Sequence, residues 1–316
     1  MSTVVVTGAA GYIGGEIALR LSDAGHRVVG IDRRSCPPHL VSAFHEYVCD
    51  DVVSSEALET IGRHRPDAVV HCAGTSLVGP SMAAPADYYE NNMVKTKRLL
   101  DAILKVTPHT RFIFSSSAAV YGIPVMTPCD EVDPREPISP YGESKLMVEQ
   151  MLASYHRAYG LDYVAFRYFN ACGADSLGRH GQEPGATHII ARVLESIRDQ
   201  QPFVLNGVDY ATADGTCVRD YVHVQDIADA HVSALSDTTP PGVYNLGTKT
   251  GTSNREIVAA AERITGQSLQ LIEGAARLGD PDVLTASDDR FGIIYPEWRK
   301  YTLDHMIAHA WRWYVR

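Results

Sequence analysis

VVVTGAAGYIGGEIALRL, residues 4–21, joins a β-branched run, three glycines spaced three residues apart and a run with helical periodicity. The β-branched run at residues 3–7 predicts a strand, and the apolar spacing over residues 13–24 predicts a helix. Glycines between a strand and a helix let the backbone approach a pyrophosphate at the helix N-terminus, so the stretch predicts a dinucleotide-binding turn. The three glycines spaced three residues apart are Gly8, Gly11 and Gly14.

Similar strand candidates recur along the first half of the chain, with helical stretches between them. They cover residues 26–31, 68–71, 111–115 and 163–168. This alternation predicts an α/β fold, a Rossmann doubly wound parallel sheet whose ligand crevice lies beyond the carboxyl ends of the strands. After about residue 170, more glycine and shorter strands predict a smaller α/β substrate-binding lobe. We expect one domain over residues 1–168, with part of 219–246, and a second over residues 169–316.

The second strand candidate ends at Asp32. A carboxylate at this position can accept hydrogen bonds from both ribose hydroxyls of a nucleotide, and it would repel a 2′-phosphate. The position therefore favours NAD over NADP, although Arg33 and Arg34 directly after it could serve a phosphate instead.

The composition is that of a globular protein with a net acidic charge. The chain has 316 residues, of which 45% are hydrophobic, and a formal net charge of −10. It lacks the basic character that nucleic acid or an anionic membrane surface needs, and no segment reaches the roughly 18 apolar residues of a membrane span. We recognise no signal sequence and no metal-like cysteine pattern. We therefore expect a cytoplasmic protein without a metal, a nucleic-acid partner or a membrane anchor.

Tyr141 and Lys145 lie four residues apart in a segment with helical periodicity, which Ser139 and Pro140 introduce as cap and first turn. Residues at i and i+4 share a helix face, so an ammonium there favours the ionised phenol and makes it a usable base. The spacing alone is weak, since sixteen tyrosines and six lysines give about 0.3 chance pairs. Ser117, just after a strand candidate, could pass a hydrogen bond between a substrate hydroxyl and the tyrosine.

Eight motifs follow one another along the chain: VTGAAGYIG, HCAG, FSSSAAVYG, SPYGESKLMVEQ, FRYFNACGA, GTCVRDYVHVQDIADAH, YNLG and RLGDPDVLTAS. In this order they resemble the extended short-chain dehydrogenase/reductase family, and within it the UDP-glucose 4-epimerases. The resemblance covers essentially the whole chain. It implies an isomerase of galactose metabolism that keeps NAD as a bound prosthetic group, takes a UDP-sugar as substrate and forms a homodimer.

The resemblance also implies roles for individual residues. Tyr141 resembles the catalytic base, Lys145 its electrostatic and ribose partner, and Ser117 the hydroxyl relay. Cofactor binding is implied for Gly8, Gly11, Tyr12, Ile13, Gly14, Asp32, Arg33, Asp51, Val52, Cys72, Ala73, Gly74, Ser76, Asn91, Ser115, Tyr141, Lys145 and Tyr168. Substrate binding is implied for Ser117, Ala118, Ala119, Tyr141, Phe169, Asn170, His188, Val204, Leu205, Asn206, Arg219, Arg277, Asp280 and Leu284. The diphosphate and uridine positions among these are Asn170, Arg219, Arg277 and Asp280. The alignment around Asp50 and Asp51 is ambiguous by one residue.

The implied mechanism needs one base that works on two faces of a sugar. Tyr141, as phenolate, takes the proton from the sugar 4-hydroxyl while the C4 hydride moves to the nicotinamide. The resulting 4-keto sugar turns about its diphosphate link, and hydride return gives the C4 epimer. The resemblance thus makes residues 1–168 an NAD-binding domain and residues 169–316 a sugar-nucleotide-binding domain. It places the dimer contact on the helix of Tyr141 and on one near residues 92–106.

Four positions bear on the range of sugars. Ser76 and Ala119 stand where many glucose epimerases carry a lysine and a threonine, so each removes one polar contact. Leu284 is smaller than the tyrosine of glucose-restricted relatives, so N-acetylated sugars could be admitted. His188 occupies a position where relatives place asparagine or histidine against the diphosphate.

Other functions stay open beside a UDP-glucose/UDP-galactose 4-epimerase. One is a 4-epimerase of a UDP-N-acetylhexosamine, a UDP-uronic acid or a UDP-pentose, for which Arg179 or His180 could meet a carboxylate. A nucleotide-sugar dehydratase is less favoured, because its relatives carry Asp and Glu where this chain has Ala118 and Ala119. A non-catalytic NAD-binding sensor would not need to keep the proton-transfer residues.

Some polar and aromatic residues have a plain structural interpretation. His71 and His223 lie in apolar strand contexts, where a histidine is more often a core residue than a ligand. Trp298, Trp311 and Trp313 lie near the C-terminus, where we expect them to pack in one last helix.

Overall fold

The computed structural model describes residues 1–276, 280–287 and 289–316. The chain forms two compact units, each built from several stretches. Unit 1 consists of Met1–Gly122, Pro134–Tyr168 and Ala228–Tyr244, and unit 2 of Ile123–Asp133, Phe169–Ile227 and Asn245–Arg316. Nothing in the sequence indicated that residues 123–133 group with the second half of the chain. The assignment of one ligand to each half of the chain stays a prediction.

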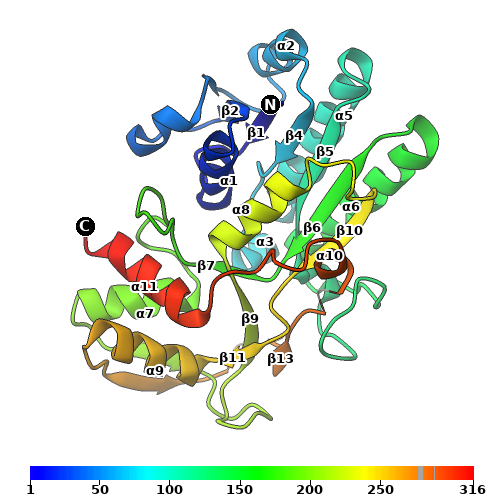
Figure 1. The fold of residues 1–316 in the computed structure, drawn as a ribbon. Helices are drawn as coiled ribbons and strands as arrows, with labels where there is room; N and C mark the ends of the chain where they lie inside the picture. Colours follow the sequence, from blue (N-terminus) through cyan, green and yellow to red (C-terminus); the bar gives the residue numbers. More distant parts are fainter. Residues whose placement is uncertain (277–279, 288) are drawn as a thin grey trace. The chain divides into compact units, whose positions relative to one another are not determined.

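A seven-stranded sheet forms the centre of unit 1, in the order β10-β6-β5-β4-β1-β2-β3 (Figure 1). β1 pairs in parallel with β2 and β4, and β5 pairs in parallel with β4 and β6. This is the strand order of a Rossmann doubly wound sheet, so the predicted fold class is confirmed. The strands are β1 (Thr3–Thr7), β2 (Arg27–Asp32), β3 (Glu46–Cys49), β4 (Ala68–His71), β5 (Arg111–Ser117), β6 (Tyr163–Tyr168) and β10 (Gly242–Leu246).

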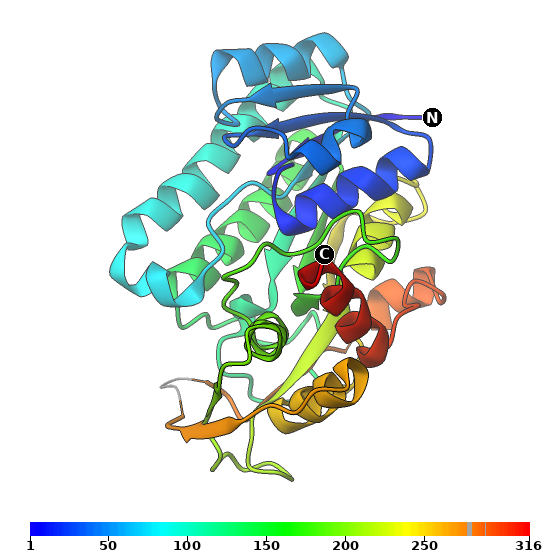
Figure 2. The ribbon, with the colours of Figure 1, turned by 90° about the vertical axis from the view of Figure 1, so that its left-hand side faces the viewer.

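Helices cover both faces of this sheet (Figure 2). On one face α2, α5 and α6 bury Ile61, Ile103 and Val148 in a core shared with the strands, and α1 packs on the other face. The helical segments are α1 (Tyr12–Asp23), η1 (Pro38–Ala43), α2 (Ser55–His64), α3 (Val78–Ala83), α4 (Pro85–Tyr88), the π-helix η2 (Tyr89–Val94), α5 (Lys95–Val106), η3 (Ala118–Tyr121) and α6 (Pro140–Tyr159). A further helix, α8 (Val224–Ser233), belongs partly to each unit.

The helix that carries Tyr141 and Lys145, α6, has the predicted start and a glycine stop. Ser139 Oγ accepts a hydrogen bond from the Gly142 N–H at 3.2 Å, so it caps the helix as the sequence predicts. At the other end Gly160, with φ of 70°, adopts the left-handed conformation that glycine tolerates without strain. These two signals fix which residues of the segment lie in the helix.

Unit 2 combines short strands with three longer helices that share a core. α7, α9 and α11 pack together around Leu194, Ile257 and Ile307. β9 pairs with β11, β13 and β7, and β8 pairs with β12. The elements are β7 (Asn170–Cys172), α7 (Ile189–Arg198), β8 (Phe203–Asn206), β9 (Val218–His223), β11 (Gly251–Ser253), α9 (Asn254–Thr265), β12 (Leu271–Gly274), β13 (Val283–Leu284), α10 (Asp289–Ile294) and α11 (Leu303–Tyr314). Among the described residues of both units, no helix is long and apolar enough to cross a membrane.

The expectation that one last helix holds all three tryptophans is wrong for Trp298. α11 begins directly after Thr302, whose backbone N–H donates to His305 Nδ1 at 3.2 Å. This local bond satisfies an amide at the helix start, so the helix does not extend back to Trp298. Trp311 and Trp313 lie in α11 as predicted.

His71, at the end of β4, is buried with a hydrogen-bond partner for each ring nitrogen. The Ala73 N–H donates to Thr7 Oγ1 at 3.3 Å, and the Thr7 hydroxyl donates to His71 Nδ1 at 2.8 Å. His71 Nε2–H donates to Thr96 Oγ1 at 2.8 Å, because the Thr96 hydroxyl proton is already used on the Asn92 carbonyl. This pattern of bonds suits a neutral imidazole, and burial lowers the pKa of His71 to about 3.

Acid should destabilise the protein through His71. The unfolded imidazole takes up a proton below its ordinary pKa of about 6.5, whereas the folded one stays neutral down to about pH 3, so the free energy of unfolding falls as the pH falls. Lowering the pH from about 7.5 to 5 should lower the free energy of unfolding by about 2 kcal/mol through this group, measured by urea unfolding at the two pH values. His71→Gln should reduce the difference; an undiminished difference in this variant would contradict the assignment.

Candidate functional site

The turn between β1 and α1 has no room for a side chain at its first or third glycine. Gly8 has φ of 70°, and a Cβ there would lie 2.7 Å from the Ala73 backbone nitrogen. A Cβ on Gly14 would lie 2.3 Å from the Gly8 carbonyl oxygen. The first turn of α1, which begins with Tyr12 and Ile13, is therefore held against a bare backbone loop. Its N-terminal amide groups and helix dipole suit a pyrophosphate, so this part of unit 1 fits a dinucleotide.

Asp32, at the end of β2, ties its carboxylate to this turn. Oδ2 accepts a hydrogen bond from the Ala10 N–H at 3.0 Å, and Oδ1 accepts one from the Arg34 N–H at 2.9 Å. The Arg34 guanidinium lies 3.5 Å from the same carboxylate, while Arg33 is exposed. This placement suits the predicted ribose contact.

The candidate adenine contact follows β3. Asp51 Oδ2 accepts a hydrogen bond from Lys95 Nζ at 2.6 Å, and its backbone N–H donates to Asp50 Oδ1 at 2.7 Å. Val52 is buried. The adenine contact at Asp50 or Asp51 stays a prediction.

Residues 72–74 follow β4 and are held by Asn92, a buried residue of η2 that sequence reasoning missed. Asn92 Oδ1 accepts a hydrogen bond from the Thr75 N–H at 2.7 Å, and its Nδ2 donates to the Thr75 carbonyl at 3.0 Å and to Ser144 Oγ at 2.9 Å. A Cβ on Gly74 would lie 2.8 Å from the same Oδ1. Asn92 therefore fastens this loop to α6.

Three other cofactor candidates lie at or beside this loop. Asn91 Nδ2 donates to Thr75 Oγ1 at 3.3 Å, and Ser76 is exposed. Cys72 Sγ accepts a hydrogen bond from Ser115 Oγ at 3.0 Å, and burial raises the pKa of the Cys72 thiol to about 11. The thiol is therefore neutral near pH 7 and is not set up as a nucleophile.

The three predicted catalytic residues come together at the end of β5 and the start of α6. The Ser117 side chain interacts with the Tyr141 phenol in the direction that lowers its pKa, and Ser117 Oγ accepts a hydrogen bond from the Ala119 N–H at 3.2 Å. Lys145 Nζ donates to the Ser115 carbonyl at 2.7 Å and lies 5.8 Å from the centroid of the Tyr141 ring. Tyr141 and Lys145 are both buried. The arrangement can move a proton at the phenol oxygen.

Burial controls the proton affinities of this cluster. It raises the pKa of Tyr141, and the interaction with Ser117 offsets only part of that rise. It also lowers the pKa of Lys145 to about 8. In the chain by itself, removing a phenolate from water therefore outweighs the effect that lowers the Tyr141 pKa, and a lowering by Lys145 stays a prediction. The phenol needs a further positive charge to act as a base near pH 7.

Tyr168 and the two alanines complete the candidates in unit 1. The Tyr168 hydroxyl lies 2.9 Å from Ser115 Oγ and 2.8 Å from His231 Nε2, within hydrogen-bond distance of both. Ala118 is buried and Ala119 is partly exposed. Neither alanine can supply an acid or a base.

In unit 2, Arg219 on β9 is the candidate for the diphosphate. Its Nη1 donates to the Val218 carbonyl at 2.9 Å, and its Nη2 lies 3.5 Å from Asp280 Oδ1. Nη2 is buried and donates no hydrogen bond to the residues that the structure describes. An unused guanidinium N–H suits an anionic oxygen. Leu284 is the strand partner of Arg219, while Arg277, the second predicted arginine, lies outside the described residues.

Asn170 and Phe169 lie at the start of the second stretch of unit 2. Asn170 Nδ2 donates to the Asp220 carbonyl at 2.8 Å, which fixes β7 on β9. Phe169 is buried, and its N–H donates to the Leu246 carbonyl at 3.2 Å.

The three candidates on β8 differ in what they present to a ligand. Val204 is exposed, and Asn206 is partly exposed at the end of the strand. Leu205 is fully buried in the core of unit 2. Only the backbone of Leu205 is therefore available to a ligand, because side chains alternate along a strand.

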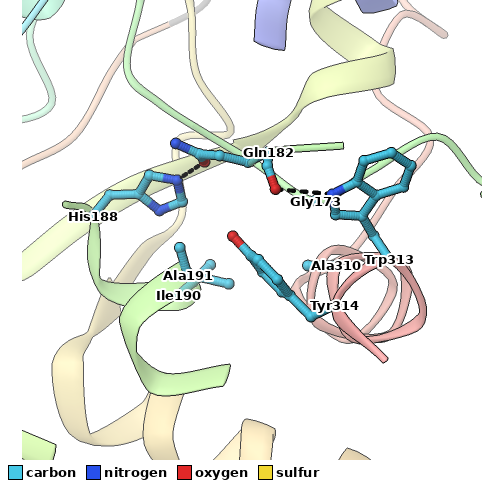
Figure 3. Close-up of a pocket in the computed structure, with 8 residues that line it drawn as sticks. All are labelled: Gly173, Gln182, His188, Ile190, Ala191, Ala310, Trp313 and Tyr314. Carbon is cyan, nitrogen blue, oxygen red and sulfur yellow. Dashed lines mark hydrogen bonds between the residues drawn. The ribbon is translucent and has the colours of Figure 1, made fainter. Parts of the chain in front are cut away.

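His188 precedes α7, and its imidazole is hydrogen-bonded to the Gln182 side chain (Figure 3). The Gln182 carbonyl in turn accepts a hydrogen bond from Trp313 Nε1 at 2.9 Å. Burial lowers the pKa of His188 to about 4, so the ring is neutral near pH 7. Gln182 Oε1 can only accept, so Nε2 carries the proton and Nδ1 does not. A contact from Nδ1 to a diphosphate would require a second proton on the ring.

A small cavity lies beside His188 within unit 2 (Figure 3). The buried Tyr314 hydroxyl points into it and has no hydrogen-bond partner among the described residues. The cavity has a volume of about 10 Å³, which matches about one water molecule and excludes a nucleotide or sugar. The lining residues are Gly173, Gln182, His188, Ile190, Ala191, Ala310, Trp313 and Tyr314.

Sequence reasoning also missed a buried ion pair whose carboxylate lies on α6, about one helical turn beyond Lys145. Arg167 on β6 donates through Nε to Glu149 Oε1 at 3.0 Å and through Nη2 to Oε2 at 2.7 Å. The signal that could have found it is spacing, since Glu149 lies four residues beyond Lys145 and eight beyond Tyr141 on one helix.

The parallel sheet, the glycine turn and the buried serine, tyrosine and lysine define a Rossmann-fold enzyme that joins a dinucleotide to proton transfer. Among the described residues, no group of three or more His, Cys, Asp and Glu side chains is placed to hold a metal ion.

Known proteins place the chain in one family. The profile of the NAD dependent epimerase/dehydratase family matches residues 4–247. A UDP-glucose 4-epimerase from Halalkalibacterium halodurans is 39% identical over 318 residues, covering 98% of this chain and 95% of its own. One from Azospirillum brasilense is 44% identical over 298 residues, covering 91% and 84%. The crystal structure of UDP-glucose 4-epimerase from Brucella ovis in complex with NAD has a TM-score of 0.93 at 40% identity, covering 98% of each chain. The chain therefore belongs to the NAD-dependent epimerase/dehydratase family.

Gly14→Ala should weaken the fold and the dinucleotide turn together. The new Cβ would lie 2.3 Å from the Gly8 carbonyl oxygen, and relieving such overpacking costs about 1–3 kcal/mol. Gly11→Ala is the matched control, because its Cβ would lie 3.1 Å from the same oxygen. Thermal unfolding and the NAD retained by the purified protein measure the effect. Equal midpoints and equal NAD content in the two variants would contradict this account of the turn.

Proposed function

We propose that this protein is an NAD-dependent 4-epimerase that interconverts UDP-glucose and UDP-galactose through a transient 4-keto sugar. The observation that carries the proposal is the buried cluster of Ser117, Tyr141 and Lys145 at the end of β5. It occurs in a chain that matches UDP-glucose 4-epimerases over 98% of its length. That chemistry requires a proton acceptor beside a hydride carrier, and the cluster supplies the acceptor.

The residues of unit 1 fit NAD as the cofactor. The closed glycine turn and the start of α1 would hold the pyrophosphate, and Asp32 the adenosine ribose. Lys145 would reach the second ribose, and Asn92 keeps the loop after β4 in place. When bound, NAD accepts and returns a hydride, and its oxidised nicotinamide carries a positive charge.

The protein's own side chains manage the proton. Tyr141 takes it from the sugar 4-hydroxyl as C4 is oxidised, and Ser117 passes a hydrogen bond between that hydroxyl and the phenol. Lys145 stabilises the phenolate. After the keto sugar has turned, Tyr141 returns the proton to the oxygen on C4, which has been reduced from its opposite face. The sugar leaves with one inverted centre and no net change of redox state.

Two functions from other classes are less well supported. Elimination of water by a dehydratase needs an additional acid and base, and the positions after Ser117 are Ala118 and Ala119. A non-catalytic sensor has no need for a buried tyrosine and lysine, because burying these groups costs free energy.

The sugar range is a separate question. A UDP-uronic acid would need a cation near C5, and Arg179 was the candidate for that contact. Arg179 is instead bound to the buried Asp175, with its Nε at 3.1 Å and its Nη2 at 2.8 Å. His180 is buried against Trp313, with ring centroids 6.1 Å apart. These contacts favour an uncharged hexose, while Leu284 keeps a UDP-N-acetylhexosamine as a second candidate.

The proposal extends to the state of the protein in the cell. It is a cytoplasmic homodimer that acts on UDP-sugars of galactose metabolism and binds neither nucleic acid nor membrane. The net charge of −10 supports the last point, and the family resemblance supports the dimer, with α5 and α6 at the contact.

The function is tested by incubating the purified protein with UDP-galactose, UDP-N-acetylgalactosamine and UDP-glucuronate. Each incubation is run without added cofactor and then with NAD, and the epimers are resolved by chromatography. UDP-galactose should give UDP-glucose. If no sugar epimerises even after NAD is supplied, the proposal fails.

Tyr141→Phe should abolish most of the activity and leave the fold intact. Losing a general base costs about 10²- to 10⁴-fold in rate, whereas the phenyl ring keeps the packing. The measurement is kcat for UDP-galactose, together with the NAD bound by the variant. Tyr159→Phe is the control, because this tyrosine of α6 is 66% exposed and far from the cluster along the helix. Full activity in Tyr141→Phe would exclude the proposed mechanism.

A further inference from the structure

Three side chains of α6, spaced four residues apart, each meet one of the consecutive serines 115–117 of β5. Ser117, the last of the three, interacts with Tyr141 in the direction that lowers the pKa of the phenol, and Lys145 Nζ donates to the carbonyl of Ser115 at 2.7 Å. Glu149 Oε1 accepts a hydrogen bond from the hydroxyl of the middle one at 2.5 Å. The base, its ammonium partner and a buried carboxylate thus occupy one helix face against one strand end.

Glu149 is also the partner of Arg167, a fully buried residue of β6. Two guanidinium nitrogens of Arg167 donate to the two carboxylate oxygens, at 3.0 Å and 2.7 Å. The third nitrogen donates to the Tyr121 hydroxyl at 2.7 Å, and the guanidinium carbon lies 4.9 Å from the centroid of the Tyr121 ring. This bidentate geometry, with every nitrogen bonded, offsets the cost of burying two charges.

Lys145 is faced by titratable groups from two directions. Cys72 and His71 lie at the end of β4, and Tyr141 and Glu149 lie on α6 itself. β5 presents an aromatic ring 4.8 Å from Nζ and a backbone carbonyl. Burial raises the pKa of Cys72 to about 11 and lowers that of His71 to about 3, so both are neutral near pH 7. Of these four groups, Glu149 is the one carboxylate.

The ammonium of Lys145 therefore depends on how the charge of Glu149 is balanced. Burial lowers the pKa of Lys145 to about 8, against the opposing effects of Cys72 and Glu149, and Cys72 is neutral at that pH. Loss of the Glu149 charge would remove the carboxylate that raises the pKa of Lys145 and leave the Arg167 cation unbalanced, so Lys145 would lose its proton more easily. Loss of the Arg167 charge would leave an unbalanced carboxylate and make the proton harder to lose.

We propose that Glu149 and Arg167 are positioning residues of the reaction: acting through Lys145, this buried pair sets the upper end of the pH range in which Tyr141 exchanges protons with the sugar. The inference rests on the proposed function for what Tyr141 does, whereas the charge state of Lys145 can be measured without any substrate. A pair that only stabilised the fold would not move that charge state in opposite directions.

The first experiment follows the protonation of Lys145 by NMR. The chain has six lysines, so the ¹³Cε signal of Lys145 can be followed against pH in lysine-labelled protein and identified by its loss in Lys145→Arg. Glu149→Gln should lower the titration midpoint by about one pH unit, since nearby charges shift a pKa by about 1–3 units. Glu149→Asp keeps the charge and changes the geometry, so its midpoint should stay close to that of the unaltered protein.

The second experiment compares the pH profile of kcat/KM for UDP-galactose in the same variants. The alkaline limb of the profile should move to lower pH in Glu149→Gln and to higher pH in Arg167→Met, by about the same amounts as the Lys145 titration midpoint. The double variant, Glu149→Gln with Arg167→Met, removes both charges, so its alkaline limb should lie between those of the single variants. It also keeps the test decisive if a single variant does not fold because it leaves one charge buried and unpaired.

The control is Asp101→Asn, which removes the carboxylate of an exposed ion pair with Lys97 and should leave the Lys145 midpoint unchanged. Equal loss of kcat at every pH with a fixed Lys145 midpoint would overturn the inference. So would shifts in the same direction from Glu149→Gln and Arg167→Met. If the midpoint shifts as expected but no UDP-sugar epimerises, the electrostatic coupling holds and the proposed function fails.

Discussion

The docking of α6 on the end of β5 is the interaction on which the proton-transfer cluster depends. Tyr141, Lys145 and Glu149 each find their polar partner on serines 115–117, in a region from which water is largely excluded. Because a buried polar group without a partner costs free energy, a shift of the helix along the strand would break all three contacts together. The same contacts that fasten the helix therefore fix the phenol and the ammonium relative to each other.

A second constraint is the close packing of backbone in the glycine turn. Cβ atoms at Gly8 and Gly14 would lie well inside contact distance of backbone atoms, so the start of α1 can approach β1 only through bare backbone. Asp32 then joins the turn to β2 through the Ala10 N–H. The turn and the cluster lie at the carboxyl ends of parallel strands, where the Rossmann topology collects loops from many parts of the chain.

Short-range patterns predicted much of unit 1. The β-branched run before Gly8 and the cap at Ser139 specified a strand and a helix start, because both signals act within a few residues. The start of the last helix was harder to predict. Trp298 was expected inside the helix, but the helix begins only after Thr302, whose N–H bonds to the His305 side chain. Asn92 and Arg167 were not found at all, since their partners lie on other elements far away in the sequence.

The sequence by itself determined the sheet class, the dinucleotide turn and the shared helix face of Tyr141 and Lys145, because each follows from spacing within one segment. Only the tertiary structure decided the charge state of that face. Burial raises the pKa of Tyr141 and lowers that of Lys145. The guanidinium of Arg167, on β6, balances the negative charge of Glu149 on the same helix face. Desolvation depends on every segment that packs around a group, and no local pattern of residues contains that information.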